Sequence, residues 1–146
     1  SIFLEPTLSD LHRRRVFDFK SQDVKSIRFA MGNPIELAQI KDGWQLESPG
    51  GRSKVARLVG DAMAERVSNL KVVSYPKTVP KNAMSQIVGE THIRLTNDRV
   101  VTLSIGSAFG SGRYARIQRD PNRIFVLSQS SIKTLTPSKE DLTHQP

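Results

Sequence analysis

Arginines are the most concentrated side chains in the sequence that could bind a ligand. In the second half of the chain the candidate binding residues are Arg94, Arg99, Arg113, Arg116, Arg119 and Arg123. A second group, Arg13, Arg14 and Arg15, follows the N-terminal segment. A guanidinium group is a planar fork of N–H donors, so it can hold a carboxylate or a phosphate by two parallel hydrogen bonds. The arginines therefore predict an anionic partner; the alternative is a charged sheet face that contacts only water.

Histidine is too scarce to support a metal site or a proton relay. The three histidines are His12, His92 and His144, and two of them lie near the chain ends. Glu90 and His92 would share one face of a strand, because side chains two residues apart point to the same side. Zinc in proteins normally has about three or four protein ligands. We therefore predict no metal site.

Other signals of catalysis or cofactor binding are missing. The chain has no cysteine, which excludes disulfides and thiol nucleophiles. It has no Gly-x-Ser-x-Gly motif of the kind that presents a hydrolase serine. Gly106, Gly110 and Gly112 suggest a phosphate-binding loop, but a strand is expected after them where that motif needs a helix. We predict no cofactor and no catalytic residue, while an active site assembled from distant residues stays open.

The composition describes a basic protein that folds in water. Twenty-two Lys and Arg residues against 14 Asp and Glu give a net charge of +8, which attracts nucleic acid, anionic lipid or an acidic protein surface. No apolar run approaches the roughly 20 residues that span a bilayer. The sequence starts at Ser1 and shows no secretory signal pattern, so we expect that an upstream segment has been removed.

Hairpin patterns alternate with one strong helical pattern in the first half. Strands are expected at 16–19 and 24–29, then a hairpin of 35–40 and 44–47 around Lys41-Asp42-Gly43. After the turn at 48–51, Ser53 is the expected N-cap of a long amphipathic helix over about 53–71. Its apolar stripe is Val55, Leu58, Val59, Ala62, Met63, Val67 and Leu70. A further strand is expected at 72–75.

The second half contains two more expected hairpins. The first joins 93–95 to 100–105 around Asn97-Asp98, and a flexible loop at 105–112 follows. The second joins 114–118 to 124–127 around Pro121, with Arg119 and Arg123 beside the turn. A short helix at 128–135 ends the pattern. Segments 1–14 and 137–146 are expected to be a lead-in and a flexible tail around one domain at 15–136.

These elements predict an α+β fold made mainly of antiparallel hairpins. Each half reads as strands followed by a helix, so we expect two architecturally similar halves, in one sheet or in two. The expected core includes Trp44, Leu58, Ala62, Leu103 and Ile105. Trp44 could instead stack on a ligand, but a single aromatic residue on a strand usually packs inward.

Three short motifs in a fixed order resemble a known family. They are Arg15-Val16-Phe17-Asp18-Phe19 before Asp23-Val24-Lys25-Ser26-Ile27; Gly43-Trp44-Gln45-Leu46 with Ser48-Pro49; and Leu103-Ser104-Ile105-Gly106 before Arg113-Tyr114-Ala115-Arg116. Over about residues 13–136 this order resembles the bacterial family catalogued as domain of unknown function 4340. The order of the motifs is more specific than any single motif, because each is made of common strand residues.

The resemblance implies a location and a type of partner. Members of that family look like extracytoplasmic domains behind an N-terminal membrane helix, and some are encoded beside transporter components linked to gliding motility. It implies no catalytic residue, and it would place Arg13, Arg14 and Arg15 near the membrane. We therefore expect a non-enzymatic envelope domain that docks to a membrane complex, an envelope component or an anionic lipid surface. The alternatives are a nucleic-acid-binding module that uses the arginine-rich strands and an unidentified enzyme.

Overall fold

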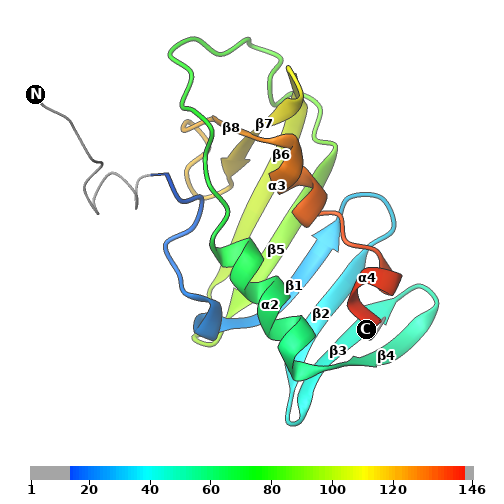
Figure 1. Ribbon diagram of the computed structural model, residues 1–146. Coiled ribbons are helices and arrows are strands. Elements are labelled where there is room, and N and C mark those ends of the chain that lie inside the picture. The colour runs from blue at the N-terminus through cyan, green and yellow to red at the C-terminus, as the bar shows by residue number, and fades with distance from the viewer. Residues whose placement is uncertain (1–13, 144–146) are drawn as a thin grey trace, which may run out of the picture.

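The structure, a computed structural model, describes residues 14–143 as one antiparallel sheet with helices against one face (Figure 1). The strands are β1 (Val24–Ala30), β2 (Ile35–Ile40), β3 (Gly43–Ser48), β4 (Gly51–Val55), β5 (Gly89–Leu95), β6 (Val100–Phe109), β7 (Gly112–Ile117) and β8 (Phe125–Leu127). A 3-10 turn, η1 (Ser21–Asp23), precedes β1. The helices are α2 (Arg57–Ser68), α3 (Gln129–Thr134) and α4 (Lys139–Thr143). The expected α+β class with an antiparallel sheet is confirmed.

The eight strands form a single sheet in the order β4-β3-β2-β1-β5-β6-β7-β8. Strands β1 and β5 pair antiparallel at its centre, with Ile27 opposite Ile93. This pairing places every strand in one continuous hydrogen-bonded sheet, so the prediction of two similar halves is not supported. None of the helices in residues 14–143 is long and apolar enough to cross a membrane.

The hairpins that the sequence predicts are present. Strands β2 and β3 meet around Lys41-Asp42, and Gly43 follows with a φ of 146°. A Cβ on Gly43 would also lie 3.1 Å from the carbonyl oxygen of Val55, so glycine is needed there for space as well as conformation. The β5–β6 turn places Asp98 at a φ of 67°, which Asp tolerates better than most residues.

The long helix predicted over about 53–71 is wrong at its start. Ser53 belongs to β4, which pairs with β3, and α2 has only 12 residues. The glycine after the Pro49-Gly50 turn, Gly51, has a φ of 124°, so the chain can reverse directly into another strand. The N-cap of α2 is Ala56, which has no capping side chain. Residues 51–55 thus gain a backbone ladder that local helical periodicity did not reveal.

Two residues predicted for the core, Leu58 and Ala62, are exposed on α2. Leu58 is 82% exposed, whereas Met63 and Val67 are buried. The reason is Gly60, where a Cβ would lie 2.1 Å from Cδ1 of Trp44. The side of α2 that contains Gly60 therefore packs directly against the indole ring. At 100° per residue, positions 58 and 62 then point away from the sheet.

The main core lies between the helices and the sheet. Trp44, Leu103 and Ile105 are buried there, as the sequence predicts. The indole Nε1 of Trp44 donates a hydrogen bond of 2.9 Å to Oδ1 of Asp61, so the polar atom of this buried ring has a partner. Trp44 therefore joins β3 to α2 by packing and by a hydrogen bond.

Two expected strands do not form. In segment 16–19, Phe17 and Phe19 are buried instead as a stacked pair with ring centroids 4.9 Å apart. Segment 72–75 contributes only a single bridge, between Ser74 and Val126. Both segments contain β-forming residues, but each runs beside the sheet rather than as a full member of it.

The C-terminal part is more ordered than predicted. The short helix expected at 128–135 is confirmed as α3, and the side chain of Ser128 caps it by accepting from the backbone N–H of Ser131 at 3.1 Å. The expected tail contains α4, which buries Leu142 to 1% exposure. Strand β6 also extends through the predicted loop to Phe109. Residues 1–13 and 144–146, and with them Arg13, His12 and His144, lie outside the described residues.

Candidate functional site on the open face of the sheet

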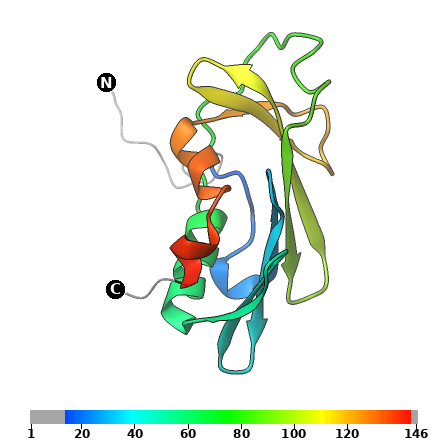
Figure 2. The ribbon, with the colours of Figure 1, turned by 90° about the vertical axis from the view of Figure 1, so that its right-hand side faces the viewer.

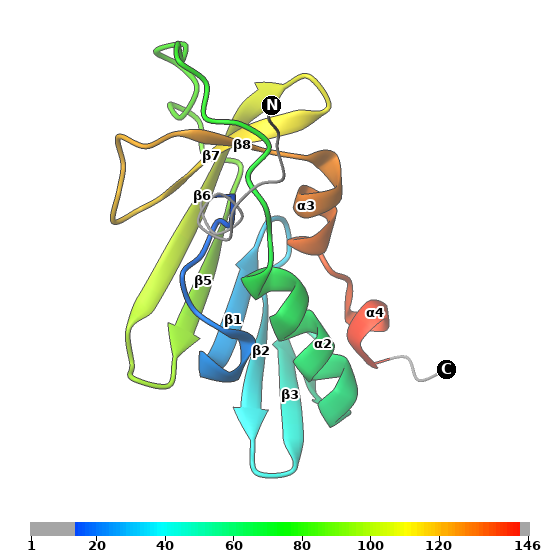
Figure 3. The same cartoon turned by 60° about the vertical axis from the view of Figure 1, so that its left-hand side comes forward.

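The two faces of the sheet are covered differently. Helices α2, α3 and α4 all lie on one side, as Figure 2 shows. We call the other side the open face. Residues 71–88, here called the connection, lead from α2 past β8 and arch over the end of the sheet (Figures 1 and 3). Its Ala83 and Met84 pack with Tyr114 and Val126, so the connection covers the β7–β8 end of the open face.

A shallow depression of about 570 Å³ lies on the uncovered centre of the open face. It is lined by Ser26, Arg28, Ala30, Glu36, Glu90, His92, Arg94 and Val100. We call it the central trough. Strands β1 and β5 place Arg28 directly opposite His92 and Arg94 directly opposite Ser26. Arg28 and Arg94 are therefore diagonal neighbours across this strand pair, about 7–8 Å apart at the backbone.

A hydrogen-bonded row of side chains fixes the wall of the trough. Nε2 of His92 lies 3.5 Å from Oε1 of Glu90, and its Nδ1 lies 3.1 Å from Oγ1 of Thr102. The hydroxyl of Ser104 donates to the other carboxylate oxygen of Glu90 at 3.2 Å. Glu90 thus contacts Nε2 and accepts from Ser104, while the other ring nitrogen of His92 shares a hydrogen bond with Thr102. The predicted shared face of Glu90 and His92 is confirmed.

The arginines of the open face, unlike this row, are free to bind. Arg28, Arg94 and Arg116 make no hydrogen bond or ion pair with other residues of the described range 14–143. Arg28 and Arg94 are exposed, and Arg116 stands opposite Ser104 on β7. Two unpaired guanidinium groups beside one depression can bind a carboxylate or phosphate by bidentate hydrogen bonds.

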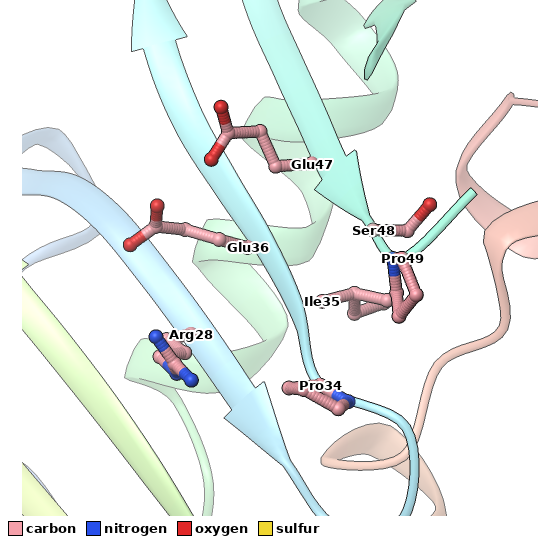
Figure 4. Close-up of a pocket in the computed structure, with 7 residues that line it drawn as sticks. All are labelled: Arg28, Pro34, Ile35, Glu36, Glu47, Ser48 and Pro49. Carbon is pink, nitrogen blue, oxygen red and sulfur yellow. The ribbon is translucent and has the colours of Figure 1, made fainter. Parts of the chain in front are cut away.

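A neighbouring hollow of about 230 Å³ holds two opposed carboxylates, drawn in Figure 4. Glu36 and Glu47 are direct cross-strand partners, and both side chains extend to the same side. Like charges at this position destabilise a strand pair. Arg52 relieves the repulsion, since its Nε lies 2.7 Å from Oε1 of Glu47. Within residues 14–143, no group of three or more potential metal ligands is found.

The other predicted arginines are spread over the molecule, and Arg99, Arg113 and Arg123 are already engaged. Arg99 pairs with Asp18 at 3.0 Å, and the guanidinium of Arg123 lies 4.5 Å from the ring centroid of Tyr75. Nε of Arg113 donates to the carbonyl oxygen of Gly106 at 2.8 Å. Arg99 and Arg119 line a separate depression of about 300 Å³. The structure thus brings only Arg94 and Arg116 of this set to the open face.

The N-terminal arginines have structural contacts where they are described. A guanidinium nitrogen of Arg15 donates to the carbonyl oxygens of Phe19 and Ser68, at 2.9 and 2.8 Å. The carbonyl oxygen of Arg14 accepts from the N–H of Val72. Arg15 therefore ties the start of the domain to the end of α2 rather than facing a ligand.

Sequence reasoning missed Arg28, Glu36, Thr102 and Ser104 as members of the site. A signal for Arg28 exists, because Ile27 and Phe29 alternate with Ser26, Arg28 and Ala30 along one strand. That alternation assigns Arg28 to the face opposite the core. Only the β1–β5 register, which no local pattern reveals, places it beside Arg94.

No protein-family model, curated protein or solved structure matches this chain. The resemblance to the domain of unknown function 4340 family therefore stays a prediction. The properties that can be assigned to the site follow from its own geometry: two free arginines, a fixed carboxylate–imidazole–hydroxyl row, and an open, shallow shape.

Proposed function

We propose that this chain is a non-enzymatic interaction domain that docks an acidic segment of a partner protein onto the central trough. The observation that carries the proposal is the pair of unpaired, exposed arginines, Arg28 and Arg94, beside one depression. Guanidinium groups at this spacing can each hold a carboxylate of the same short segment. The hydroxyls of Thr102 and Ser104 and the imidazole of His92 keep the trough wall in place for it.

A protein segment suits this surface better than a nucleic acid does. Glu36 and Glu90 lie among the arginines, and both would repel a continuous polyanion along the trough. A protein can place acidic side chains over Arg28 and Arg94 and polar groups over the glutamates. Nucleic-acid sites also use exposed aromatic rings for stacking, and neither Tyr75 nor Phe109 lines the trough.

The cellular setting belongs to the same proposal. The family resemblance supports an extracytoplasmic position behind an N-terminal membrane anchor, with a membrane complex or envelope component as the partner. A docking surface made of fixed strands fits that role, because a rigid surface loses little conformational entropy when it binds.

The test is recovery of partners from native cells. The full-length protein is affinity-purified in mild detergent, with and without nuclease, as the wild type and as Arg28→Glu and Arg94→Glu. We expect nuclease-resistant recovery of one or more membrane-complex or envelope subunits, and about a tenfold loss for each reversed arginine, because each change replaces an attraction by a repulsion. Lys133→Glu, on α3 across the sheet, makes the same charge change and should leave recovery unaltered.

Two outcomes would contradict the proposal. Equal recovery by the wild type and both arginine variants would remove the trough from the binding surface. Recovery that disappears with nuclease would instead favour the nucleic-acid module. Unfolding temperatures must stay within a few degrees of the wild type, since exposed charges contribute little to stability.

A further inference from the structure

The two edges of the sheet differ in whether their backbone groups are paired. At the β8 edge, the N–H of Val73 donates to the carbonyl oxygen of Val126 at 2.9 Å, and the N–H of Val126 donates to Ser74 at 3.0 Å. At the other edge, β4 pairs with β3 alone. Within residues 14–143, no backbone hydrogen bond reaches β4 from outside the β3–β4 hairpin. A free edge of this kind can accept another strand.

The register identifies which backbone groups of β4 are free. Ser48 and Gly51 close the two-residue turn, and such a closing pair exchanges both of its hydrogen bonds. Hydrogen-bonded and non-hydrogen-bonded pairs then alternate, so Ser53 and Val55 bond to β3. The N–H and C=O groups of Arg52 and Lys54 therefore point away from the sheet.

The same two residues carry basic side chains on the open face. Lys54 makes no ion pair within the described residues, and the side chain of Arg52 is 73% exposed beside Glu47. A third cation is close to the turn, because Nζ of Lys139 lies 3.9 Å from the position that a Cβ would take on Gly50. Charge at this edge therefore favours an acidic strand.

We propose that β4 accepts an extended segment of an acidic protein as a ninth strand of the sheet. The incoming backbone would bond to the free groups of Arg52 and Lys54. Acidic side chains at alternate positions would lie beside the two basic side chains on the open face. A second copy of this chain fits poorly, because antiparallel pairing of two β4 strands sets basic side chains against one another.

This edge is separate from the central trough. Three strand spacings separate β4 from β1, or about 14 Å at 4.8 Å each. The proposal therefore does not depend on Arg28 or Arg94, and the two surfaces can be tested independently.

The probe is a synthetic capped peptide, Thr-Val-Glu-Val-Glu-Val-Thr, whose two glutamates share one strand face. A control peptide of the same composition places the glutamates side by side, so that they point to opposite faces. Binding to the 146-residue chain is followed by NMR with amide hydrogen exchange. We expect the alternating peptide to bind about tenfold more tightly than the control and to slow exchange selectively at Arg52 and Lys54.

Two substitutions of Lys54 distinguish the contribution of its backbone N–H to peptide binding from that of its side-chain charge. Lys54→Pro removes an N–H that points away from β3, so the hairpin is retained while peptide binding is lost. Lys54→Ala keeps the N–H and loses the charge, so binding should weaken only severalfold. Ser53→Pro removes an N–H of the β3–β4 ladder and serves as the control that destabilises the hairpin itself.

The assignment would be overturned in three ways. Absence of binding, or equal binding of both peptides, would exclude specific strand addition by an acidic segment. Loss of peptide binding in Arg28→Glu, with exchange unchanged at Arg52 and Lys54, would assign the peptide to the trough and leave the docking proposal standing. Concentration-dependent dimers that disappear in Lys54→Pro would assign the edge to a second copy. If Lys54→Pro does not fold, slowed amide exchange at Arg52 and Lys54 of the wild type still shows whether the peptide binds at β4.

Discussion

The chain itself covers the β8 edge and the open face beside it, whereas the β4 edge and the open face near it, together called the bare side, are uncovered. The connection pairs with the β8 edge through Val73 and Ser74, and it covers the open face there with Ala83 and Met84. In the described chain, no segment pairs with the free edge of β4, and none covers the central trough. Polar and charged side chains make the bare side compatible with water. Because this surface is uncovered and charged, it offers a partner the most groups to bind.

The largest loss of stability is expected from substitution of Trp44, which packs between β3 and α2 on the helix side of the sheet. Trp44→Ala removes the ring on which α2 rests and should destabilise the protein by about 3–5 kcal/mol, as large-to-small core changes do. Trp44→Phe keeps most of the packing, loses the bond to Asp61 and should cost about 1–2 kcal/mol. Chemical denaturation measures both. Equal stability of Trp44→Ala and the wild type would mean that the ring is not a core residue.

A second substitution, at Gly106, disrupts the contact between the connection and the open face. Gly106 lies under the connection, where a Cβ would be 2.4 Å from the carbonyl oxygen of Ala83 and 2.5 Å from the sulfur of Met84. Gly106→Leu should lift the connection from the open face and cost about 1–3 kcal/mol, the usual range for overpacking. Limited proteolysis within residues 77–86 and binding of a dye to exposed apolar surface would report it. Gly110→Leu, in open space but at a φ of 60°, tests backbone strain alone.

The smallest effect concerns α4, which contacts β4 from the helix side. The backbone N–H of Ser138 donates to the carboxylate of Asp141, and the N–H of Asp141 donates to the hydroxyl oxygen of Ser138. The backbone bond, followed by the Ser138 side chain, lowers the pKa of the Asp141 carboxyl group. A group with a lowered pKa in the folded state stabilises it above the unfolded pKa, near 4, and loses that contribution as the pH falls through the folded value. We expect α4 to fray on acidification below about pH 4.

The chemical shift of Leu142 would follow the acid transition of α4, with Asp141→Asn as the control. This variant should show a weakened α4 at neutral pH and little further change in acid. An acid transition of Leu142 that is identical in Asp141→Asn would place its origin elsewhere.

Much of the fold was predictable because its signals are local. The hairpins around Asp42, Asn97 and Pro121 are marked by turn residues between alternating strands, and α3 begins at a serine cap. The helix α4 also had a readable signal, since Ser138 and Asp141 have the spacing of a capping box. By contrast, Val55 continues the helical apolar spacing of the segment that follows it, so the sequence extends the predicted helix back to Ser53, where pairing with β3 overrides it.

The site was less predictable than the fold. The number of arginines predicted an anionic partner, but the side chains of Arg99, Arg113 and Arg123 are tied to Asp18, a backbone carbonyl and Tyr75. Arg28, which has one of the best positions for binding, is isolated in the sequence among apolar neighbours. A side chain's availability depends on what lies beside it across strands, and a count of charges does not contain that information.

The sequence by itself determined the α+β class, the hairpin turns, the basic charge and the absence of thiol chemistry, because these follow from composition and from contacts a few residues apart. Only the tertiary structure decided that eight strands share one sheet, that Gly60 turns Leu58 outward, and that Arg28 meets Arg94. Each of these depends on a pairing between residues far apart in the chain. Such pairings are selected by packing of the whole core, so local patterns cannot specify them.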